Sequence, residues 1–485
     1  MCGATTKGID SLSLQHAARK RCSLSFHSVN PATEQALASF PATTPDELEA
    51  ALARAVDAFE TWSQHSVAER VAPLRRAGEL LRERANVLAR QLALEMGKPL
   101  DQGEAEIEKC ALVCDFYAEH AAEFLADEPT LLAGATVVPR PLGPILAIMP
   151  WNFPAWQAFR FFAPTLAAGN VALLKHAENV QGCAEDLVAL LADAGFPAGV
   201  AQNIRVPVAE IEALIGRPEV RAVTLTGSTA AGRAVARAAG TALKKCVLEL
   251  GGCDAAVILE DADLDRAVEE CVTSRLINSG QSCIATKRCI VVDAVRDEFT
   301  ARVVERMGEM RCADPLGESP AELGPLARED LRDALHDQVE RACRAGGELL
   351  LGGRVRPGRG WFYPPTVIAD FAASSPVSSE ETFGPVLTLI GARDATEAIG
   401  RANATSYGLG ASIYTRDVER GSQIARTQLE AGSAFVNGFV RSDPRVPFGG
   451  IGDSGFGREL GRAGILEFVN RKSVVVLDGS PSTRK

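Results

Sequence analysis

Short apolar runs alternate with helix-like segments through the middle of the chain. Residues 145–149 and 255–259 are fully apolar, and residues 220–226 form another predicted strand. Such runs are typical of strands buried inside a parallel sheet, and a helix between successive strands supplies the crossover that a parallel sheet needs. The pattern predicts an α/β fold. Extended segments at 362–367 and 380–386 predict a second α/β half.

The length and charge of the chain limit its class. At 485 residues it is too long for one ordinary hydrophobic core, so two or three domains are expected. The formal net charge of −11 argues against a nucleic-acid or anionic-membrane partner, because both require a basic surface. Twelve cysteines without a Cys-x-x-Cys pair predict a reducing, cytoplasmic setting rather than a disulfide framework.

The sequence predicts neither a membrane anchor nor a metal site. No apolar run approaches the ~20 residues that span a bilayer, and residues 1–22 lack the apolar stretch of a secretory signal. The six histidines include no His-Glu-x-x-His arrangement, so no metal is expected. These observations favour an enzyme that acts on a small molecule.

Periodicity predicts helices over residues 46–60, 68–96 and 103–126. The Glu- and Ala-rich face of the third helix is expected to be structural. Three prolines within residues 137–144 predict an exposed arm or edge strand. The β-branched run at 474–477 predicts an exposed strand that could join the sheet of another subunit.

The segment 278–283, Asn-Ser-Gly-Gln-Ser-Cys, is a candidate site of chemistry. Gly280 allows the backbone to approach a ligand closely, and the small polar neighbours predict a tight loop. A partly exposed thiol becomes a strong nucleophile where its surroundings favour the thiolate, so Cys283 is a candidate nucleophile. The alternative is that Cys283 is one more small buried cysteine, which is the commoner fate of a free cysteine.

Glu249 lies between two leucines at the end of a predicted strand. Apolar surroundings disfavour the charged form of a carboxyl group and adapt it to general-base work. The alternative is an edge-strand glutamate that faces water. Together with the thiol of Cys283, this carboxylate suggests a thioester that is hydrolysed by activated water.

Two further segments follow predicted strands. Asn152 lies among prolines and aromatic residues, where a buried amide needs a partner, although asparagine is also a favoured helix N-cap. The turn at 227–232 joins a strand to a helix, and its free N–H groups suit a phosphate. Such a turn is more often a plain connection, and it matches neither Gly-x-Gly-x-x-Gly nor a P-loop.

The segments 248–252 and 280–283 resemble the glutamate and cysteine signatures of the NAD(P)-dependent aldehyde dehydrogenases. The resemblance extends from about residue 28 to about residue 475 through an ordered series of motifs: 96–99, 150–154, 174–178, 227–228, 249, 283, 381–385 and 447–450. Within the family, the segments 173–177, 244–252 and 442–448 are most similar to bacterial succinate-semialdehyde dehydrogenases.

The resemblance implies an aldehyde dehydrogenase-like fold with two Rossmann-like α/β domains and a small β oligomerisation arm. The expected boundaries are an N-terminal extension at 1–27, a cofactor-binding domain at 28–121 and 142–251, a catalytic domain at 252–447, and an arm at 122–141 and 468–485. The arm implies a homodimer or a homotetramer.

The resemblance also implies residue roles. Cys283 attacks the aldehyde, Asn152 and the Cys283 N–H bind the oxyanion, and Glu249 activates water. The cofactor is expected to contact Trp151, Lys175, Glu178, Gly227, Ser228, Leu250, Glu381 and Phe383. NAD is expected to be preferred, with NADP possible, because the Glu178 carboxylate accepts from a ribose 2′-hydroxyl and repels a 2′-phosphate.

Arg160 and Ser442 are the expected substrate-binding residues, because a guanidinium suits the carboxylate of succinate semialdehyde. The alternative for Arg160 is a structural ion pair. Ile277 stands where some family members have another arginine, so the substrate could instead be another small aliphatic aldehyde or semialdehyde. Ala285 stands where some members have a second cysteine, which argues against a vicinal disulfide.

Three rival functions remain. A CoA-acylating semialdehyde dehydrogenase is disfavoured because that reaction needs no water-activating Glu249. A catalytically idle binding protein is disfavoured because the residues that the mechanism needs are present. A cysteine hydrolase is disfavoured because no histidine lies near Cys283 in sequence, although spatial proximity stays open.

Overall fold

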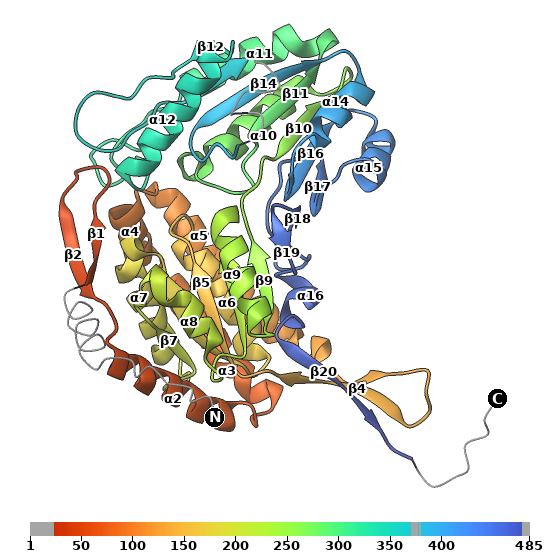
Figure 1. Ribbon diagram of the computed structural model, residues 1–485. Coiled ribbons are helices and arrows are strands. Elements are labelled where there is room, and N and C mark those ends of the chain that lie inside the picture. The colour runs from red at the N-terminus through yellow and green to blue at the C-terminus, as the bar shows by residue number, and fades with distance from the viewer. Residues whose placement is uncertain (1–23, 370–376, 378–379, 478–485) are drawn as a thin grey trace, which may run out of the picture.

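The structure is a computed structural model that describes residues 24–369, 377 and 380–477. The described strands form two large sheets, one of seven and one of six strands, together with a three-stranded sheet and two sheets of two strands each (Figure 1). Helices surround the two large sheets, and the parallel pairing within both confirms the predicted α/β fold class. The predicted extension at 1–27 lies outside the described residues as far as residue 23.

The six-stranded sheet has the order β19-β9-β8-β5-β6-β7 among the described residues. Its strands are β5 (Pro144–Met149), β6 (Val171–His176), β7 (Ala201–Asn203), β8 (Ala222–Thr226), β9 (Lys245–Glu249) and β19 (Gly455–Phe456). All neighbours pair in parallel except β19, which is antiparallel to β9. Parallel pairing brings the carboxyl ends of β5, β6, β8 and β9 to one edge, which is where α/β sheets bind ligands.

The seven-stranded sheet has the order β12-β13-β14-β11-β10-β16-β17 in the described part of the chain. Its strands are β10 (Ala255–Ile258), β11 (Arg288–Val292), β12 (Glu348–Leu351), β13 (Thr366–Ala369), β14 (Val386–Ala392), β16 (Gly410–Tyr414) and β17 (Ser433–Val436). Only β12 runs antiparallel to its neighbour. The four strands β10, β11, β13 and β16 are buried along their whole length, as expected for strands covered on both faces.

Eight helices among the described residues accompany the six-stranded sheet: α2 (Pro45–Trp62), α3 (Val67–Glu83), α4 (Ala85–Met96), α5 (Leu100–Phe124), α6 (Pro154–Ala167), α7 (Gln181–Asp193), α8 (Ile211–Gly216) and α9 (Thr229–Thr241). The single helix predicted over 68–96 is wrong, because Arg84 leaves helical geometry with φ −107° and separates α3 from α4. Both helices bury residues in the same core, so their apolar pattern continues across the break. No described helix has the length and hydropathy needed to cross a bilayer.

The remaining helices pack on the seven-stranded sheet or connect the two halves: α10 (Leu264–Leu276), α11 (Asp293–Gly308), α12 (Glu329–Arg344), α14 (Ala395–Asn403), α15 (Val418–Thr427) and α16 (Gly461–Ile465). Separate apolar clusters lie on the two faces of this sheet. At the other side of the molecule, the hairpin of β1 (Ser25–Val29) and β2 (Ala36–Pro41) lies along its edge (Figure 1).

A three-stranded sheet reaches away from the body of the molecule (Figure 1). Its described order is β20-β4-β3, with β20 (Val469–Val475), β4 (Ala135–Pro141) and β3 (Glu128–Pro129). The prediction of an exposed arm is confirmed, but β4 is the central strand rather than an edge strand. The prolines of β4 are tolerated because β3 pairs only with Thr136 and Val137, so Pro139 and Pro141 have a partner strand on one side only.

Candidate active site

The predicted cofactor residues gather at one edge of the six-stranded sheet. Trp151 and Asn152 follow β5, Lys175 lies at the end of β6, Gly227 and Ser228 follow β8, and Leu250 follows β9. These strands are neighbours in the parallel part of the sheet. The sheet topology therefore brings together segments that lie as much as about a hundred residues apart in the chain.

Cys283 lies on a loop between α10 and β11 whose backbone is strained. Asn278, Ser279 and Gly280 all have positive φ, of 56°, 55° and 76°. A Cβ on Gly280 would lie 2.3 Å from the carbonyl group of Gly384, so only glycine fits there. The expected close approach at Gly280 is thus to the chain's own backbone, and the strain is of the kind that persists at functional sites.

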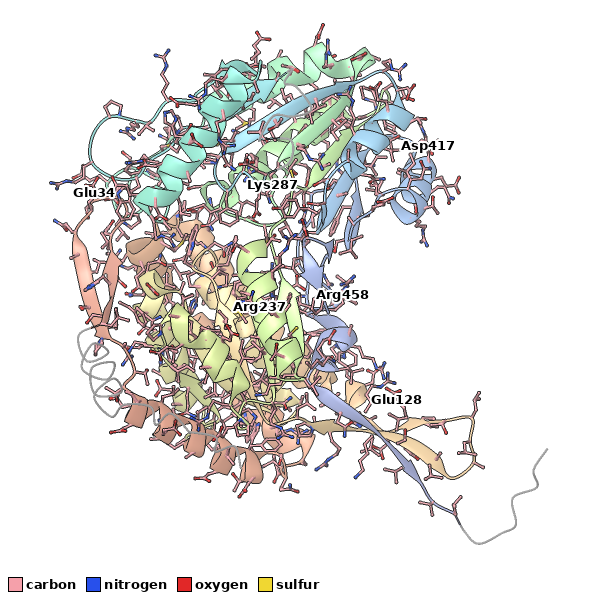
Figure 2. All side chains as sticks on the ribbon, in the orientation of Figure 1. Glu34, Glu128, Arg237, Lys287, Asp417 and Arg458 are labelled. Atoms are coloured by element: carbon pink, nitrogen blue, oxygen red, sulfur yellow. The ribbon has the colours of Figure 1, made fainter. Side chains whose placement is uncertain are left out.

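Lys287 anchors this loop, and Figure 2 places this lysine near the junction of the two large sheets. Its fully buried ammonium group donates to the carbonyl oxygens of Ser282, at 2.8 Å, and of Cys283, and it lies 3.5 Å from a carboxylate oxygen of Glu381. The sequence analysis missed Lys287, because nothing in the local pattern separates it from a surface lysine. Its hydrogen bonds fix the carbonyl groups of the loop and leave the Cys283 N–H without a hydrogen bond in the described structure.

The Cys283 thiol is held protonated at rest. Burial raises the pKa of Cys283 to about 12, and the nearby charges of Lys287 and Arg160 offset only part of this increase. The sequence analysis expected surroundings that favour the thiolate, and the structure differs because the loop excludes water from a half-buried thiol. The thiol must therefore lose its proton before it can attack.

Asn152 does not cap helix α6, because the N-cap position belongs to Phe153. Its buried side-chain amide donates to the carbonyl oxygen of Gln281 at 3.1 Å. An amide group has two N–H bonds, so one remains for a ligand. The main-chain carbonyl of Asn152 accepts from Asn278 at 2.7 Å and from Lys98 at 3.1 Å. Hydrogen bonds therefore join Asn152 directly to the loop that carries Cys283.

A buried ion pair supports Asn152 from the other side. Lys98 and Glu106 are joined by an ion pair whose side chains are almost completely buried. Glu106 also accepts from the backbone N–H groups of Ala155, at 3.0 Å, and of Trp156, at 2.9 Å, in the first turn of α6. The carboxylate thereby satisfies free donors of the helix. The sequence analysis missed this pair, since its members are eight residues apart and their partners lie elsewhere.

Glu249 is buried at the end of β9 and does not face water, so the edge-strand alternative is wrong. Neither of its carboxylate oxygens has a hydrogen-bond partner within the described residues. Burial, and next the negative charge of Glu459, raise the pKa of Glu249 well above its usual value. A carboxyl group in such surroundings is a strong base in its deprotonated form.

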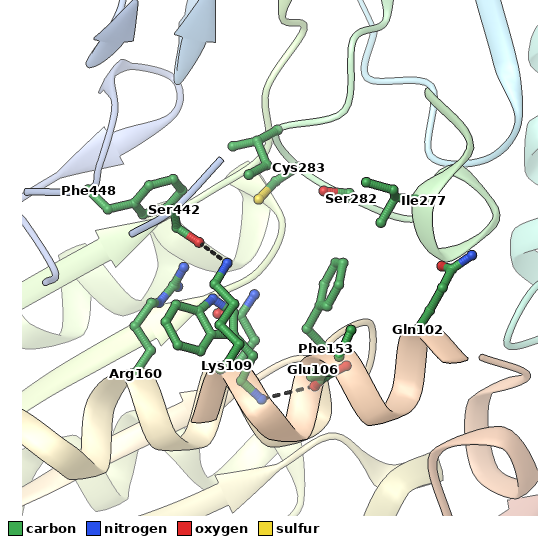
Figure 3. A pocket seen from close by; sticks show the side chains of 14 residues that line it. Gln102, Glu106, Lys109, Phe153, Arg160, Ile277, Ser282, Cys283, Ser442 and Phe448 are labelled. Carbon is green, nitrogen blue, oxygen red and sulfur yellow. Dashed lines mark hydrogen bonds between the residues drawn. The ribbon is translucent and has the colours of Figure 1, made fainter. Parts of the chain in front are cut away.

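A cavity of about 260 Å³ opens beside the thiol. Helices α5 and α6 and the loops at 277–284 and 442–448 line it, and Figure 3 shows the Cys283 sulfur pointing into it from one side. Its wall combines apolar side chains with a few polar ones. The lining residues include Lys109, Phe153, Trp156, Arg160, Ile277, Cys283, Ser442 and Phe448.

Arg160 lines this cavity, yet it has internal partners. Its guanidinium group forms a buried ion pair with Glu459 and donates to the Thr226 hydroxyl at 3.0 Å. Its guanidinium carbon also lies 5.1 Å from the centre of the Phe448 ring. The structural ion pair that the sequence analysis left as an alternative is therefore present.

Ser442 lies beside a second cation that the sequence analysis missed. The Ser442 hydroxyl oxygen accepts from the Lys109 ammonium group at 2.7 Å. Lys109 lies on α5, whose polar face was expected to be structural. The sequence could not separate it from its charged neighbours, because only the packing of α5 against α6 turns it toward the cavity.

The residues of the sheet edge fit a dinucleotide. Lys175 is buried without a hydrogen bond or ion pair among the described residues, and burial lowers its pKa. Ser228 caps α9 by accepting from the N–H of Ala231 at 3.2 Å, which confirms the predicted strand–turn–helix segment. Glu178 is exposed on the 3₁₀ turn Glu178–Val180. A buried cation without a partner and a helix N-terminus at the same edge suit polar ligand groups.

Residues from the seven-stranded half of the molecule face this edge of the six-stranded sheet. Glu381 accepts from the Gly252 N–H at 3.1 Å. The rings of Phe383 and Trp151 meet edge to face with centres 5.7 Å apart. Leu250 is buried against Gly232, where any Cβ would clash with it. The predicted cofactor residues of the two halves therefore meet at this edge, through the Trp151–Phe383 ring contact and the hydrogen bond between Glu381 and Gly252.

Comparisons with known proteins agree with this geometry. Residues 19–474 match the Aldehyde dehydrogenase family. The chain is 45 % identical over 449 residues to the succinate semialdehyde dehydrogenase Sad of Escherichia coli (strain K12), covering 92 % of this chain and 97 % of that protein. It is 46 % identical over 451 residues to the succinate-semialdehyde dehydrogenase 1 of Mycobacterium tuberculosis (strain ATCC 25618 / H37Rv), which is named for NADP, with 92 % and 98 % coverage.

A solved structure supports the same relation. The succinic semialdehyde dehydrogenase of Streptococcus pyogenes, in complex with NADP+, superimposes with a TM-score of 0.91 at 35 % sequence identity, covering 93 % of this chain and 99 % of that one. Both the sequence matches and the structural match extend over nearly the whole chain. The chain belongs to the aldehyde dehydrogenase family.

Proposed function

We propose that this enzyme oxidises succinate semialdehyde to succinate with NAD(P). The observation that carries the proposal is the cavity beside Cys283, whose wall combines apolar side chains with the polar groups of Arg160, Lys109 and Ser442. An aldehyde at one end of a short aliphatic chain and a carboxylate at the other match such a cavity. The names of the relatives from E. coli and M. tuberculosis support the same substrate.

In the proposed reaction the Cys283 thiol releases its proton to the solvent, and the thiolate attacks the aldehyde carbon to form a thiohemiacetal. Its oxyanion accepts hydrogen bonds from the Cys283 N–H and from the free N–H of the Asn152 amide. Bound NAD(P) supplies the hydride acceptor that converts the thiohemiacetal into a thioester. Glu249, once deprotonated, removes a proton from water, which attacks the thioester and releases the carboxylic acid and the thiol.

The same residues argue against transfer of the acyl group to CoA. Burial of the Glu249 carboxyl group without a hydrogen-bond partner in the described structure costs free energy. A role in activating water would explain why this group is present. Product analysis with and without CoA separates the two reactions. We expect free succinate in both cases and no succinyl-CoA.

The substrate proposal is tested by initial rates of NAD(P)H formation with succinate semialdehyde, butanal and glutarate semialdehyde. We expect kcat/KM for succinate semialdehyde to exceed that for butanal by about 10²-fold, because one charged anchor supplies a few kcal/mol. An equal kcat/KM for butanal would contradict succinate semialdehyde as the substrate. It would not affect the assignment of the chain to the family.

Replacement of Asn152 by alanine is expected to lower kcat by about 10²–10³-fold, since one oxyanion donor is lost. The hydrogen bonds of the Asn152 main chain to Lys98 and Asn278 remain available in this variant, so the loop should keep its position. Steady-state kinetics and thermal melting measure both effects. An unchanged kcat in a folded variant would exclude Asn152 from the oxyanion site.

We further propose that NAD is preferred over NADP. The exposed Glu178 carboxylate would accept from a free ribose 2′-hydroxyl and repel a 2′-phosphate, while Lys175 would offset part of the repulsion. Glu178→Gln is therefore expected to raise kcat/KM for NADP relative to NAD by about tenfold. The ratio of the two values in wild type and variant measures this. Better turnover with NADP in the wild type would contradict the preference.

The division of the chain is proposed on the same basis. Residues 28–121 and 142–251 would bind the cofactor, and residues 252–447 would supply Cys283. Residues 122–141 and 468–485 would form the arm, of which residues 478–485 lie outside the described part of the chain. Val474 and Val475 on β20 are exposed, which supports pairing of the arm with another subunit in a homodimer or homotetramer. A cytoplasmic location agrees with the unpaired state of the described cysteines.

A further inference from the structure

Lys287 is a fully buried lysine that is fixed in the seven-stranded sheet just before β11. Its main-chain N–H donates to the Asp254 carbonyl oxygen at 3.0 Å, and its own carbonyl oxygen accepts from the Thr388 N–H at 3.0 Å. The neighbouring strands therefore determine where the side chain starts. Burial of an ammonium group costs free energy unless nearby groups compensate for the lost water, so its contacts indicate its role.

The Lys287 ammonium group has three N–H bonds, and the described structure places three oxygen atoms around it. It donates to the carbonyl oxygens of Ser282, at 2.8 Å, and of Cys283, and a carboxylate oxygen of Glu381 lies 3.5 Å away. The two carbonyl groups belong to the loop that carries the nucleophile. The carboxylate belongs to the segment 380–385, which is expected to contact the cofactor. One cation therefore joins the two segments.

A second buried cation links the same two segments. Arg275, in the last turn of α10, donates to the carbonyl oxygens of Gly280 and of Thr382, the latter at 3.4 Å. The backbone of Gly280 also lies so close to Gly384 that no Cβ fits between them. These contacts do not involve the side chain of Lys287, so they should keep the loop in place when Lys287 is replaced.

Lys287 is also the charge that most favours the thiolate of Cys283. Burial raises the pKa of Cys283, and among the surrounding charges Lys287 lowers it most, followed by Arg160, while Glu381 and Asp254 raise it. These groups face the thiol from the start of β11, from α6, from the segment 380–385 and from the segment before β10. Glu381 therefore opposes Lys287, through its own charge and by pairing with the ammonium group.

We propose that Lys287 is a positioning residue for the nucleophile, which holds the carbonyl groups of Ser282 and Cys283 and stabilises the thiolate, and that Glu381 opposes it through the same ammonium group. This inference deepens the proposed function, because it rests on Cys283 as the nucleophile. The ammonium group is bonded to the main chain of Cys283 itself. The loop therefore brings the cation close to the sulfur wherever it places the cysteine.

Alkylation of Cys283 by iodoacetamide, followed by peptide mass mapping, tests this in enzyme that holds neither aldehyde nor cofactor. The cavity beside the sulfur, of about 260 Å³, admits a small reagent (Figure 3). The thiolate is the reacting form, so the rate at a fixed pH follows the ionised fraction. We expect Lys287→Met to lower the rate about tenfold, because a nearby opposite charge commonly changes this fraction by about tenfold or more. Lys287→Arg keeps the charge and should recover part of the rate.

Glu381→Gln is expected to change the rate in the opposite direction. Glutamine keeps an acceptor for the Gly252 N–H and removes the negative charge. Alkylation of Cys283 should therefore become faster, by about threefold, since Glu381 affects the thiol less than Lys287 does. An equal or slower rate in Glu381→Gln would overturn the proposed opposition.

A purely structural role of Lys287 predicts a different sign. If the lysine only supported the loop, its removal would loosen the loop, expose the thiol and make alkylation faster. An unchanged or faster alkylation of Cys283 in a folded Lys287→Met variant would therefore overturn the proposal. If Lys287→Met does not fold, the rates of Lys287→Arg and Glu381→Gln decide: alkylation slower than in the wild type for Glu381→Gln contradicts the proposal, and faster alkylation supports it.

Lys472→Met is the matched control, because Lys472 is an exposed lysine on β20, away from the cavity. Its Cys283 should be alkylated at the wild-type rate. Cys343, which is half-buried on α12, serves as an internal control in the same digest, and its rate should be equal in the two methionine variants. Thermal melting identifies variants that do not fold. The melting temperature of Lys287→Met is expected to fall, since two buried carbonyl groups lose their donor.

The kinetics of the reaction separate this inference from the proposed function. Lys287 does not line the cavity in the described structure, so Lys287→Met should slow the first turnover about as much as it slows alkylation and leave KM for the aldehyde unchanged. A wild-type enzyme that forms no NAD(P)H with succinate semialdehyde would overturn the proposed function, and the alkylation rates would still decide the role of Lys287. An active wild type together with wild-type alkylation in Lys287→Met would overturn only this inference.

Discussion

Replacement of Cys283 by alanine is expected to abolish NAD(P)H formation, with a loss of about 10⁴-fold or more in kcat, as is typical when a covalent nucleophile is removed. No other cysteine among the described residues lines the cavity. The substitution removes one sulfur atom from a half-buried position, so the fold should survive. Initial rates at saturating aldehyde and cofactor measure the loss, and thermal melting confirms the fold.

Cys343→Ala is the matched control for this variant. Cys343 is also half-buried, but it lies on α12 away from the cavity. We expect wild-type rates from this control. Substantial activity in a folded Cys283→Ala variant would contradict covalent catalysis by Cys283 and would require another group to hold the aldehyde.

Replacement of Glu249 by glutamine is expected to separate the two halves of the reaction. The thioester should still form, because Cys283 and the oxyanion donors are intact, but its hydrolysis loses the base. Stopped-flow measurement should show a burst of about one NAD(P)H per active site, followed by a steady rate that is lower by about 10²–10⁴-fold. Glutamine has nearly the shape of the glutamate side chain but cannot act as the base.

The control for this variant is Glu212→Gln, which changes an exposed glutamate on α8. It should behave as the wild type in both phases. A Glu249→Gln variant that is slow from the first turnover, without a burst, would place the action of Glu249 before the thioester. Deprotonation of the buried Cys283 thiol would then be the step that it assists.

Much of the fold could be predicted because it depends on local pattern. Largely buried strands such as β5 and β11 are short apolar runs, and the predicted end of a helix at residue 96 agrees with the end of α4 at Met96. The strand-end positions of Asn152 and Glu249 followed from the same runs. Parallel topology then brings strand ends together, so the outline of the site was accessible from sequence.

The missing parts depend on contacts between distant segments. Lys98 pairs with Glu106 beneath Asn152, Lys287 holds the Cys283 loop, and Lys109 reaches Ser442 across more than three hundred residues of sequence. Each looks like an ordinary surface lysine in the sequence, because lysine is usually exposed. Only packing reveals that these three are buried or half-buried and bonded to the site.

The raised pKa values of Cys283 and Glu249 have the same origin. A sequence shows which groups can ionise, but the pKa depends on how far each group is removed from water and on charges such as that of Glu459. The break between α3 and α4 at Arg84 was hidden for a related reason. Both helices share one core, so the apolar pattern does not change where the backbone does.

The most direct test of the central claim is the mass of the Glu249→Gln variant after mixing with succinate semialdehyde and NAD. We predict that intact-protein mass spectrometry shows the addition of one succinyl group, and that peptide mapping assigns it to Cys283. A parallel sample with Cys283→Ala in the same background should remain unmodified. An unmodified Glu249→Gln protein that nevertheless produces NADH, or an adduct on a different residue, would contradict the proposed chemistry.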